Sequence, residues 1–568
     1  MRILLLTHAF NSLTQRLYVE LTALGHQVSV EFDINDRVTE EAVALFRPHL
    51  ILGSFLKRAI PESIWRTQVC LILHPGIVGD RGPSALDWAI LNGETEWGVT
   101  LLQAEAEMDA GPIWATQTFP MRSARKSSLY RNEVTEAAVQ VVRSAIERWP
   151  EYLAGHWRPQ PLRPHDPAVR GRFRPAMTQR DRAIDWAKDD TATVLAKLNS
   201  ADGAPGVLDE LFGQPCYLYD AHAVPGWPPP GAQLGRSGDD GVVRACRDGA
   251  VKIGHVRHKE GAPSIKLPVA LSFPEVALLP EWSGGGDEIR YEEVEGVGYL
   301  YFDFYNGVMG SEACQRLLVT YEAARQRPTR VIVLMGGADF FSNGLDLNRI
   351  EAAASPPDES WRNINAMDDL CRAILTTGSH LTVSALRGNA GAGGAYLALA
   401  ADRVWARRGV ILNPHYKNMG NLYGSEYWSY LLPKRVGAEQ VSALLRGRLP
   451  LGADQAAALG FVDEVFGDDP AGFEAETRRR TAALAESPDF ADLLREKNRR
   501  RAADEAAKSL EAYRAEELEH MQRNFYGFDP SYHVARHHFV HKTPHSWTPR
   551  HLARHRELGW VVPVEEMA

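Results

Sequence analysis

Two separate segments of the chain carry the residue types that acyl-group chemistry needs. The first runs from His74-Pro75 to Asp109-Ala110-Gly111-Pro112, and its histidine follows an apolar stretch directly. An imidazole accepts and returns protons near neutral pH, and a carboxylate can orient it. The second segment contains two glycine-rich turns, at 342–347 and 388–402. Backbone N–H groups in such turns can stabilise an oxyanion as it forms.

The elements around the first segment alternate between strand and helix patterns. Such alternation predicts a doubly wound, mostly parallel sheet with crossover helices. Ligands of these sheets bind beyond the carboxyl ends of the strands, which is where His74 follows the strand at 69–73. Residues 1–168 are therefore predicted to form one α/β domain. The expected strands are 1–6, 27–32, 49–53 and 69–73, and the expected helices are 13–24 and 40–46.

The first segment resembles the catalytic region of folate-dependent formyltransferases and formyltetrahydrofolate hydrolases. Those families carry Asn-x-His-Pro at a strand end and an Asp-x-Gly-Pro loop, which His74-Pro75 and Asp109–Pro112 match. The resemblance covers about residues 1–165 and continues into a small domain through Ile184-Asp185-Trp186. It implies that His74 and Asp109 are catalytic and that Arg81 and Gly111 contact substrate. The matching runs between them are Arg81-Gly82, Trp88-Ala89-Ile90, Asn92-Gly93-Glu94-Thr95 and Gly98-Val99-Thr100.

One position departs from the formyltransferase pattern. Ile72 stands where those families carry an asparagine that donates to the formyl oxygen. The loss of one such donor costs on the order of 10²–10³ in rate in other enzymes. Either another donor substitutes near Ile72, or the acceptor of the formyl group has changed. The purely structural alternatives are a packing role for His74 and a surface position for Arg81.

The two glycine-rich turns resemble the oxyanion-hole loops of the crotonase superfamily, which contains the enoyl-CoA hydratases and isomerases. Ser342-Asn343-Gly344-Leu345-Asp346-Leu347 matches the first loop, and Gly388 to Asp402 matches the second. The resemblance places the N–H groups of Leu345 and Gly393 in the hole, with Gly344 beside them. Small residues at 390–395 let the backbone approach a helix N-terminus, whose dipole adds to the stabilisation.

The acid and base of the hydratases are missing from this second region. Tyr396 replaces the first hydratase glutamate, and 409–413 contains no carboxylate where the second belongs. Addition of water to a double bond is therefore not expected. Tyr416 and Glu426 are the best available acid and base, and the sequence does not assign which is which. Alternatively, Tyr416 only packs, and Glu426 complements the dipole at the start of a helix.

The rest of the chain is predicted to form three further parts. Residues 169–285 read as one helix followed by short strands, a small β-rich domain that ends in a glycine linker at 283–286. Residues 286–470 form the crotonase-like domain, and 471–568 a helical region rich in histidine and arginine. The whole chain is thus a multidomain α/β protein.

Four histidines in the last region raise the question of a metal site. His533, His537 and His541 follow one another at intervals of four, which places imidazoles on one helix face, and His538 lies beside them. No HExxH motif or cysteine ligand accompanies them, and the neighbouring Arg536 and Lys542 would repel a cation. Solvated or packed histidines are the preferred interpretation, and no metal is expected.

Composition excludes several classes of protein. The 568 residues are 45% hydrophobic and 24% charged, and the formal net charge is −9, which disfavours a general nucleic-acid-binding protein. No apolar stretch approaches the roughly 20 residues that span a bilayer. The five cysteines are scattered without a CxxC motif, as expected for free thiols in a reducing cytoplasm.

The order of parts and both departures resemble the HypX/HoxX family of [NiFe]-hydrogenase maturation proteins over the full length. The resemblance implies N10-formyltetrahydrofolate as the donor, coenzyme A as the acceptor, and formyl-CoA as an intermediate that yields carbon monoxide for the hydrogenase iron. The implied partners are folate, CoA and a hydrogenase large subunit or maturation complex.

Two rival hypotheses remain at this stage. In one, a formyltetrahydrofolate hydrolase or formyltransferase is fused to an independent acyl-CoA enzyme. In the other, the chain is a non-catalytic scaffold that delivers folate or a nascent iron complex.

Overall fold

The computed structural model describes residues 1–163, 166–167, 169–224, 233–238, 240–261, 264–282 and 288–557. Its contacts divide the chain into two compact units. One contains Met1–Gly285 and the segment that begins at Pro544, and the other contains Gly286–Thr543. The four-part division expected from the sequence stays a prediction, and the glycine linker expected at 283–286 lies outside the described residues.

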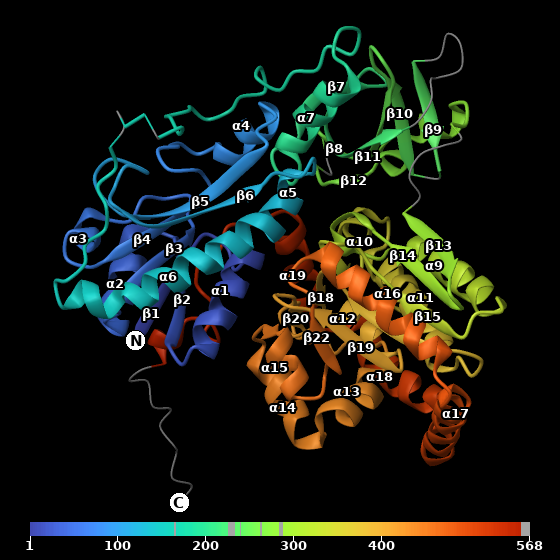
Figure 1. The fold of residues 1–568 in the computed structure, drawn as a ribbon. Helices are drawn as coiled ribbons and strands as arrows, with labels where there is room; N and C mark the ends of the chain where they lie inside the picture. The colour runs from blue at the N-terminus through green and yellow to red at the C-terminus, as the bar shows by residue number, and fades with distance from the viewer. Residues whose placement is uncertain are drawn as a thin grey trace, which may run out of the picture. The chain divides into compact units, whose positions relative to one another are not determined.

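The first unit opens with a six-stranded sheet in the order β2-β1-β3-β4-β5-β6 (Figure 1). The first four strands are parallel, and β5 and β6 add an antiparallel pair at one edge. β1 is an almost continuous apolar run that is buried along its length, as expected for a parallel strand covered on both faces. The strands are β1 (Arg2–Thr7), β2 (Gln27–Phe32), β3 (Leu50–Phe55), β4 (Cys70–His74), β5 (Glu96–Gln103) and β6 (Ile113–Pro120).

Helices cover this sheet and join its strands. α1 and α6 pack against each other, and α6 lies along β5 and β6, whereas α2 packs on β1 and β2. The helices are α1 (Ser12–Ala23), α2 (Asp36–Phe46), α3 (Glu62–Trp65), α4 (Ala85–Leu91), α5 (Lys126–Leu129), the π-helical turn η1 (Tyr130–Val134) and α6 (Thr135–Leu153).

The small domain of the first unit is β-rich, as predicted. Its sheet has the order β7-β8-β11-β10-β9, with β12 paired to β11, and all of its pairings are antiparallel. One helix, α7, precedes the strands and packs on β8. The elements are α7 (Thr191–Ala201), β7 (Val207–Leu211), β8 (Gln214–Val224), β9 (Leu234–Ser237), β10 (Gly241–Ala245), β11 (Ala250–His258), β12 (Leu267–Pro268), α8 (Val269–Ser272) and the 3₁₀ turn η2 (Pro274–Leu278).

The last described segment, 544–557, covers the outer edge of the first sheet. The Val30 N–H of the edge strand β2 donates a hydrogen bond to the Leu552 carbonyl. Glu31, which is fully buried on the same strand, pairs with His555 at 2.8 Å and with Arg556 at 2.7 Å. The 3₁₀ turn η4 (Arg554–Arg556) carries both partners. The segment thus shields a strand edge that would otherwise be open to solvent.

The second unit is built on a six-stranded sheet of order β13-β14-β15-β17-β19-β22, parallel except for the β13–β14 hairpin. Alternate residues of its strands enter two different cores. Leu300 and Ile332 face a core shared with α9 and α11, whereas Tyr299 and Val333 face a core shared with α16 and α17. The strands are β13 (Ile289–Val294), β14 (Val297–Phe302), β15 (Val331–Leu334), β17 (Leu381–Leu386), β19 (Arg403–Arg407) and β22 (Glu464–Phe466).

A second, smaller sheet in this unit brings the two glycine-rich turns together. It contains β16 (Phe340–Ser342), β18 (Asn389–Gly391), β20 (Ile411–Asn413) and β21 (Leu451–Gly452) in that order. β16, β18 and β20 are parallel, so the segments that follow them leave the sheet at the same edge.

Helices make up most of the remaining second unit (Figure 1). α11 packs against α9 on one side and α18 on the other, and α19 packs against α10 and α18. The helices are the 3₁₀ turn η3 (Tyr305–Gly307), α9 (Ser311–Ala324), α10 (Leu347–Ala352), α11 (Pro356–Leu375), α12 (Gly393–Leu399), α13 (Trp428–Val436), α14 (Ala438–Gly447), α15 (Ala453–Ala458), α16 (Pro470–Glu486), α17 (Phe490–Ala507), α18 (Leu510–Tyr526) and α19 (Ser531–Val540). Within the described part of the chain, no helix is long and apolar enough to cross a membrane.

Candidate active sites

His74 ends β4 and lies between two carboxylates. Its side chain is almost completely buried, with Nε2 3.0 Å from Asp80 Oδ1 and Nδ1 3.6 Å from Asp109 Oδ2. The contact with Asp80 is a hydrogen bond, whereas the separation from Asp109 is too long for a hydrogen bond. The hydrogen bond to Asp80 fixes the orientation of the imidazole, and its other nitrogen faces Asp109.

The loop that carries Asp109 is built to bring its carboxylate to His74. Asp109 adopts a positive φ of 56°, and its Oδ2 accepts a hydrogen bond from the Gly82 N–H at 3.2 Å. Gly111 approaches β5 so closely that an added Cβ would lie 1.9 Å from the Gln103 carbonyl oxygen. The glycine is therefore required by packing, which explains its place in the motif without a substrate contact.

The two other residues expected near the first site have defined surroundings. Ile72 lies two residues before His74 on β4, so both side chains point to the same face. It is half-buried against the core that contains Ile51 and Cys70, and it supplies no donor. The Arg81 guanidinium forms an ion pair with Glu107, in the same loop as Asp109. Arg81 thus anchors the loop in this structure.

The two glycine-rich turns of the second unit meet as the sequence predicts. Gly344 has a φ of 77°, and a Cβ built on it would lie 3.2 Å from the Gly393 nitrogen. Leu345 follows Gly344 directly, and Gly393 is the first residue of α12. The Gly344 and Gly393 backbones therefore lie against each other at the place where the resemblance leads us to expect the Leu345 and Gly393 N–H groups to donate to one oxygen.

Glu426 points at this pair of turns. It is fully buried, and its Oε1 has no hydrogen-bond partner among the described residues. A Cβ added to Gly393 would lie 2.0 Å from that oxygen. Glu426 and the following Tyr427 both adopt a φ of 59°, a strained conformation for residues other than glycine. The sequence interpretation had Glu426 opening a helix, but α13 begins only at Trp428 and the carboxyl faces α12 instead.

Tyr416 holds the other oxygen of Glu426. Its hydroxyl donates to Glu426 Oε2 at 2.5 Å, and its ring stacks on Tyr396 with the centroids 5.3 Å apart. Tyr396 in turn donates to the Pro414 carbonyl at 2.7 Å, so its hydroxyl is already engaged. Tyr396 therefore supports Tyr416, and Glu426 Oε1 is the free polar atom of this group.

Two further buried carboxylates lie beside Glu426. Ser425 Oγ is 2.8 Å from Asp368 Oδ2 and 3.2 Å from Glu517 Oε2. Because the hydroxyl carries one proton, it can donate to only one of the two carboxylates at a time. Burial, followed by the charge of Asp368, raises the pKa of Glu426 to about 8. Burial also raises the pKa of Glu517 to about 8 and that of Asp368 to about 6.

Sequence reasoning missed Asp80, Asp368 and Glu517. Asp368 carried a detectable signal, because it lies with Ile364, Met367 and Cys371 on the apolar face of α11. Glu517 carried the same signal, because it lies with Leu510, Met521 and Phe525 on the buried face of α18.

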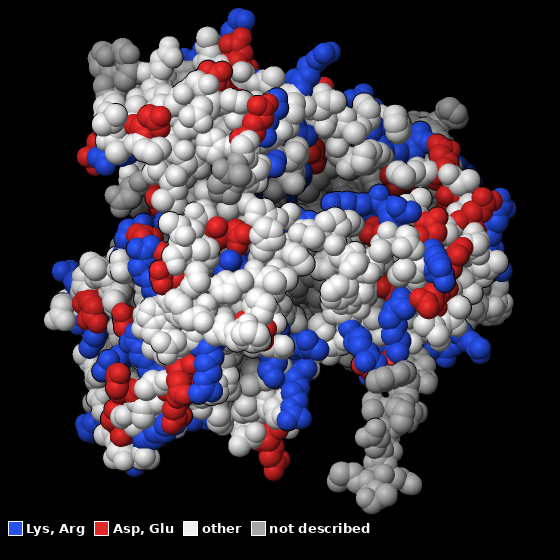
Figure 2. Space-filling model, turned by 180° about the vertical axis from the view of Figure 1, so that it is seen from behind, with Lys and Arg blue, Asp and Glu red and all other residues white. Residues whose placement is uncertain are grey.

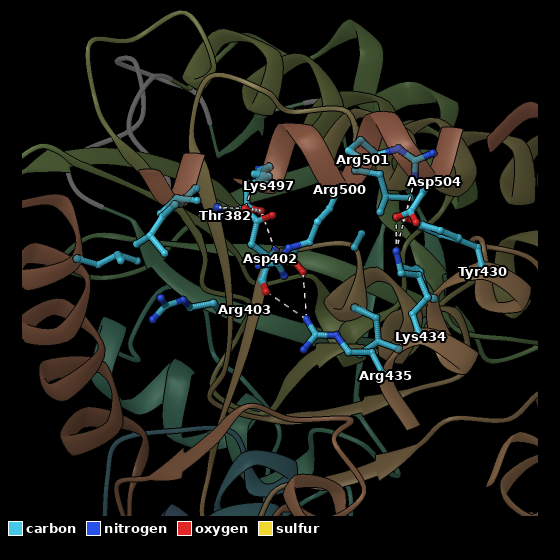
Figure 3. Close-up of a pocket in the computed structure, with 18 residues that line it drawn as sticks. Thr382, Asp402, Arg403, Tyr430, Lys434, Arg435, Lys497, Arg500, Arg501 and Asp504 are labelled. Atoms are coloured by element: carbon cyan, nitrogen blue, oxygen red, sulfur yellow. Dashed lines mark hydrogen bonds and ion pairs between the residues drawn. The ribbon is translucent and has the colours of Figure 1, made fainter. Parts of the chain in front are cut away.

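A separate pocket of about 330 Å³ lies at the amino ends of β17 and β19 and contains none of the predicted site residues (Figure 3). Several of its labelled cations contact carboxylates: Lys497 lies 2.6 Å from Asp402, and Lys434 pairs with Asp504. Asp402 also accepts from Thr382 Oγ1 at 2.9 Å. We interpret these pairs as an ion-pair network that joins α13 and α17 to the sheet.

On the face of the molecule in Figure 2, positive and negative side chains are interspersed.

Comparison with known protein families agrees with these two sites. A formyl transferase model matches residues 29–146, and a model of the formyl transferase C-terminal domain matches residues 176–265. An enoyl-CoA hydratase/isomerase model matches residues 309–549. The fold and the sites thus define a protein that joins a formyltransferase-type unit to an enoyl-CoA hydratase/isomerase-type unit.

Relatives with the same combination identify the family. The hydrogenase maturation factor HoxX of Bradyrhizobium diazoefficiens is 55% identical over 562 residues, 98% of this chain and 97% of that protein. A crystal structure of HypX from Aquifex aeolicus in complex with tetrahydrofolic acid is 47% identical, with a TM-score of 0.93 over 99% of this chain and 100% of that one. A variant HypX structure from the same organism also has a TM-score of 0.93, over 98% and 99% of the two chains. The chain belongs to the HypX/HoxX family of hydrogenase maturation factors.

Proposed function

We propose that the protein converts the formyl group of N10-formyltetrahydrofolate into carbon monoxide in two steps. In the first unit the formyl group passes to the thiol of CoA, giving tetrahydrofolate and formyl-CoA. In the second unit formyl-CoA splits into carbon monoxide and free CoA. Neither step needs an oxidant or reductant, because the formyl carbon loses a proton and a thiolate and the thiolate takes up a proton.

The first step is assigned to His74, Asp109 and Asp80. A thiol must lose a proton to attack the formyl carbon, and the imidazole between two carboxylates is the group placed to accept it. The related Aquifex protein binds tetrahydrofolic acid, which supports a folate site in this chain. Ile72 supports an acceptor other than water or an amine, because it removes the donor that the formyltransferase and hydrolase resemblance leads us to expect.

The second step is assigned to Glu426 and the turns at Leu345 and Gly393. The two N–H groups hold the carbonyl oxygen of the formyl thioester. Glu426 Oε1 takes the proton from the formyl carbon while the C–S bond breaks, and then delivers that proton to sulfur. Tyr416 fixes Oε2 by its hydrogen bond, so that Oε1 is the atom that exchanges the proton.

The unpartnered Oε1 of Glu426 carries this proposal. A buried carboxyl oxygen without a partner is costly, and such costs are retained where function needs them. A pKa of about 8 also suits a group that must both accept and return a proton near neutral pH.

The proposal extends to the use of the product. We propose that the carbon monoxide is the ligand for the iron of a [NiFe]-hydrogenase, and that a hydrogenase large subunit or maturation complex receives it. The relative from Bradyrhizobium is named as a hydrogenase maturation factor, which supports that destination. All five cysteines are free and buried, which supports a reducing cytoplasm as the location.

A product assay on the pure protein tests the proposal. Protein, N10-formyltetrahydrofolate and CoA are incubated, and carbon monoxide, formyl-CoA and formate are measured. Wild type should release carbon monoxide in step with tetrahydrofolate. Formate as the sole product would instead identify a hydrolase, and no turnover would favour a delivery scaffold.

Variants separate the two steps. His74→Ala should stop consumption of formyltetrahydrofolate. Glu426→Gln should continue to consume it but accumulate formyl-CoA or formate, with carbon monoxide reduced about 10²–10⁴-fold. Glu439→Gln, an exposed position on α14, is the matched control and should behave as wild type. Normal carbon monoxide release by Glu426→Gln would remove Glu426 from the mechanism.

A further inference from the structure

Three side chains outside both candidate active sites converge on one point. Glu351 is on α10, whereas His537 and His541 lie one turn apart at the end of α19. His537 Nδ1 is 2.7 Å from Glu351 Oε1, and His541 Nε2 is 3.2 Å from the same oxygen. One ligand atom from each residue lies within 4.8 Å of the other two.

The Glu351 carboxylate is held in place through its second oxygen. Arg536 donates to the other oxygen, Glu351 Oε2, at 2.8 Å, and its side chain is only 5% exposed. Arg536 also donates to His533 Nδ1 at 2.8 Å. With Oε2 fixed in this way, Oε1 is left facing the two imidazoles. A partner that orients a carboxylate in this manner is typical of the residues that support metal ligands.

The two cations that argued against a metal site in the sequence contact atoms other than Glu351 Oε1 and the two imidazole nitrogens that face it. Arg536 is committed to Glu351 Oε2 and His533. Lys542 places its ammonium 4.2 Å from the centroid of the Phe539 ring. Two of the four histidines, His537 and His541, share a carboxylate, which the preferred interpretation of solvated or packed side chains did not include.

We propose that Glu351, His537 and His541 bind a divalent transition-metal ion of the zinc class. Two imidazoles and one carboxylate are borderline donors that suit Zn²⁺, Co²⁺ or Ni²⁺, whereas Mg²⁺ and Ca²⁺ prefer oxygen ligands alone. The His537 side chain is 55% exposed and that of His541 32%, so water or an external ligand can complete the coordination. The bound ion would tie α19 to α10.

The alternative is an ion pair without metal, in which protonated imidazoles donate to Glu351. The two arrangements respond to pH in opposite directions. Protonation strengthens the ion pair, but it removes the lone pairs that a metal needs. Metal affinity should therefore fall as the solution is acidified.

Equilibrium binding to the full-length, untagged protein tests the proposal. After chelator treatment, Zn²⁺ is titrated in competition with a chromophoric chelator at pH 7.5. We expect one equivalent to bind to wild type. The double variant His537→Ala/His541→Ala should bind at least about tenfold more weakly, because even the loss of a residue that only supports a metal ligand costs about that much affinity. His538→Ala, an exposed change on the same helix, is the control and should bind as wild type.

A measurement on wild type alone guards against a variant that fails to fold. X-ray absorption at the zinc edge should give a coordination shell with two imidazoles and oxygen donors. No binding by wild type, binding that persists unchanged in the double variant, or a shell without imidazole would each overturn the proposal.

Discussion

Ile72 in the first candidate site and Tyr396 in the second are comparable departures from the family patterns. Each replaces a polar group that the resembling families use to handle water or an amine. Ile72 shares the face of β4 with His74, and Tyr396 is committed to the Pro414 carbonyl. At the residue scale, the proposed function therefore assigns to both changes the removal of competing chemistry, with His74 and Glu426 retained beside them.

Restoring the missing amide tests this view of Ile72. Ile72→Asn should raise the rate of formate release from formyltetrahydrofolate without CoA, by up to about 10²–10³-fold if the amide reaches the formyl oxygen. Asparagine is smaller than isoleucine, and the site is only half-buried, so the change is tolerable. Ile72→Leu is the control and should leave formate release unchanged. Equal formate from both variants would show that Ile72 does not limit hydrolysis.

Motifs pointed to pairs of candidate site residues, and missed the buried carboxylates beside them. His74 with Asp109 and Tyr416 with Glu426 were paired from sequence, and the structure places each pair together. Their assigned roles remain predictions. Asp80 and Glu517 were not found, because neither belongs to the family motifs on which the prediction of the sites depended.

At the scale of elements, α12 and the turn before it form the wall of the second site. Gly393 leaves room for Glu426 Oε1 and cannot hold a side chain there. Parallel strands β16, β18 and β20 bring the turns to one edge, which the sequence implied only through the resemblance. Helix starts were less well predicted: the helix expected at 40–46 begins at Asp36, because the Asn35 side chain caps it at the Val38 N–H.

Gly393→Ala should disable the second step alone. Its Cβ would displace the Glu426 carboxyl and obstruct the oxyanion turn, so carbon monoxide release should fall at least about 10²-fold while formyltetrahydrofolate is still consumed. Gly447→Ala, where a Cβ meets nothing within 4 Å, is the matched control and should keep full activity. Wild-type carbon monoxide release by Gly393→Ala would place the oxyanion hole elsewhere.

α11 supplies the charge that tunes Glu426. Burial first, and then the negative charge of Asp368, raise the pKa of Glu426, so Asp368→Asn should lower it. An asparagine can still accept from the Glu426 N–H and donate to Ser425 Oγ, so the local hydrogen bonds survive. If Glu426 begins the reaction as a carboxylate, carbon monoxide release rises with pH through about 8, and the rise moves to lower pH in Asp368→Asn.

The pH profile of carbon monoxide release checks this positioning role. Glu439→Gln, an exposed change on α14, is the control and should leave the profile unmoved. A rate that falls with rising pH would reverse the proposed order and make Glu426 an acid first. A profile identical in all three proteins would show that Glu426 does not set the pH dependence.

At the scale of the whole molecule, the C-terminal segment belongs to the first unit although it follows the second unit in the sequence. Residues up to Thr543 group with the second unit, whereas the segment from Pro544 groups with the first. Sequence patterns describe local periodicity, and nothing in a histidine-rich stretch indicates which strand edge it will cover. The partner that draws this segment to β2 is Glu31, a glutamate inside an apolar strand.

The pairing of Glu31 with this segment predicts how the first unit loses stability. Burial alone would raise the pKa of Glu31, but hydrogen bonds from His555 and Thr548 and the Arg556 charge outweigh it and lower the pKa. A lowered pKa means that the pairing stabilises the fold above the unfolded pKa of about 4.3 and is lost as the pH falls through the folded value.

His555→Ala should therefore lower the free energy of unfolding at pH 7 by about 1–3 kcal/mol, because a buried carboxylate loses a partner, and by less in acid. Hydrogen exchange at the β2 amides measures the effect locally, with the exposed His156→Ala as control. Unchanged protection of β2 in His555→Ala would show that the segment covers the strand without stabilising it.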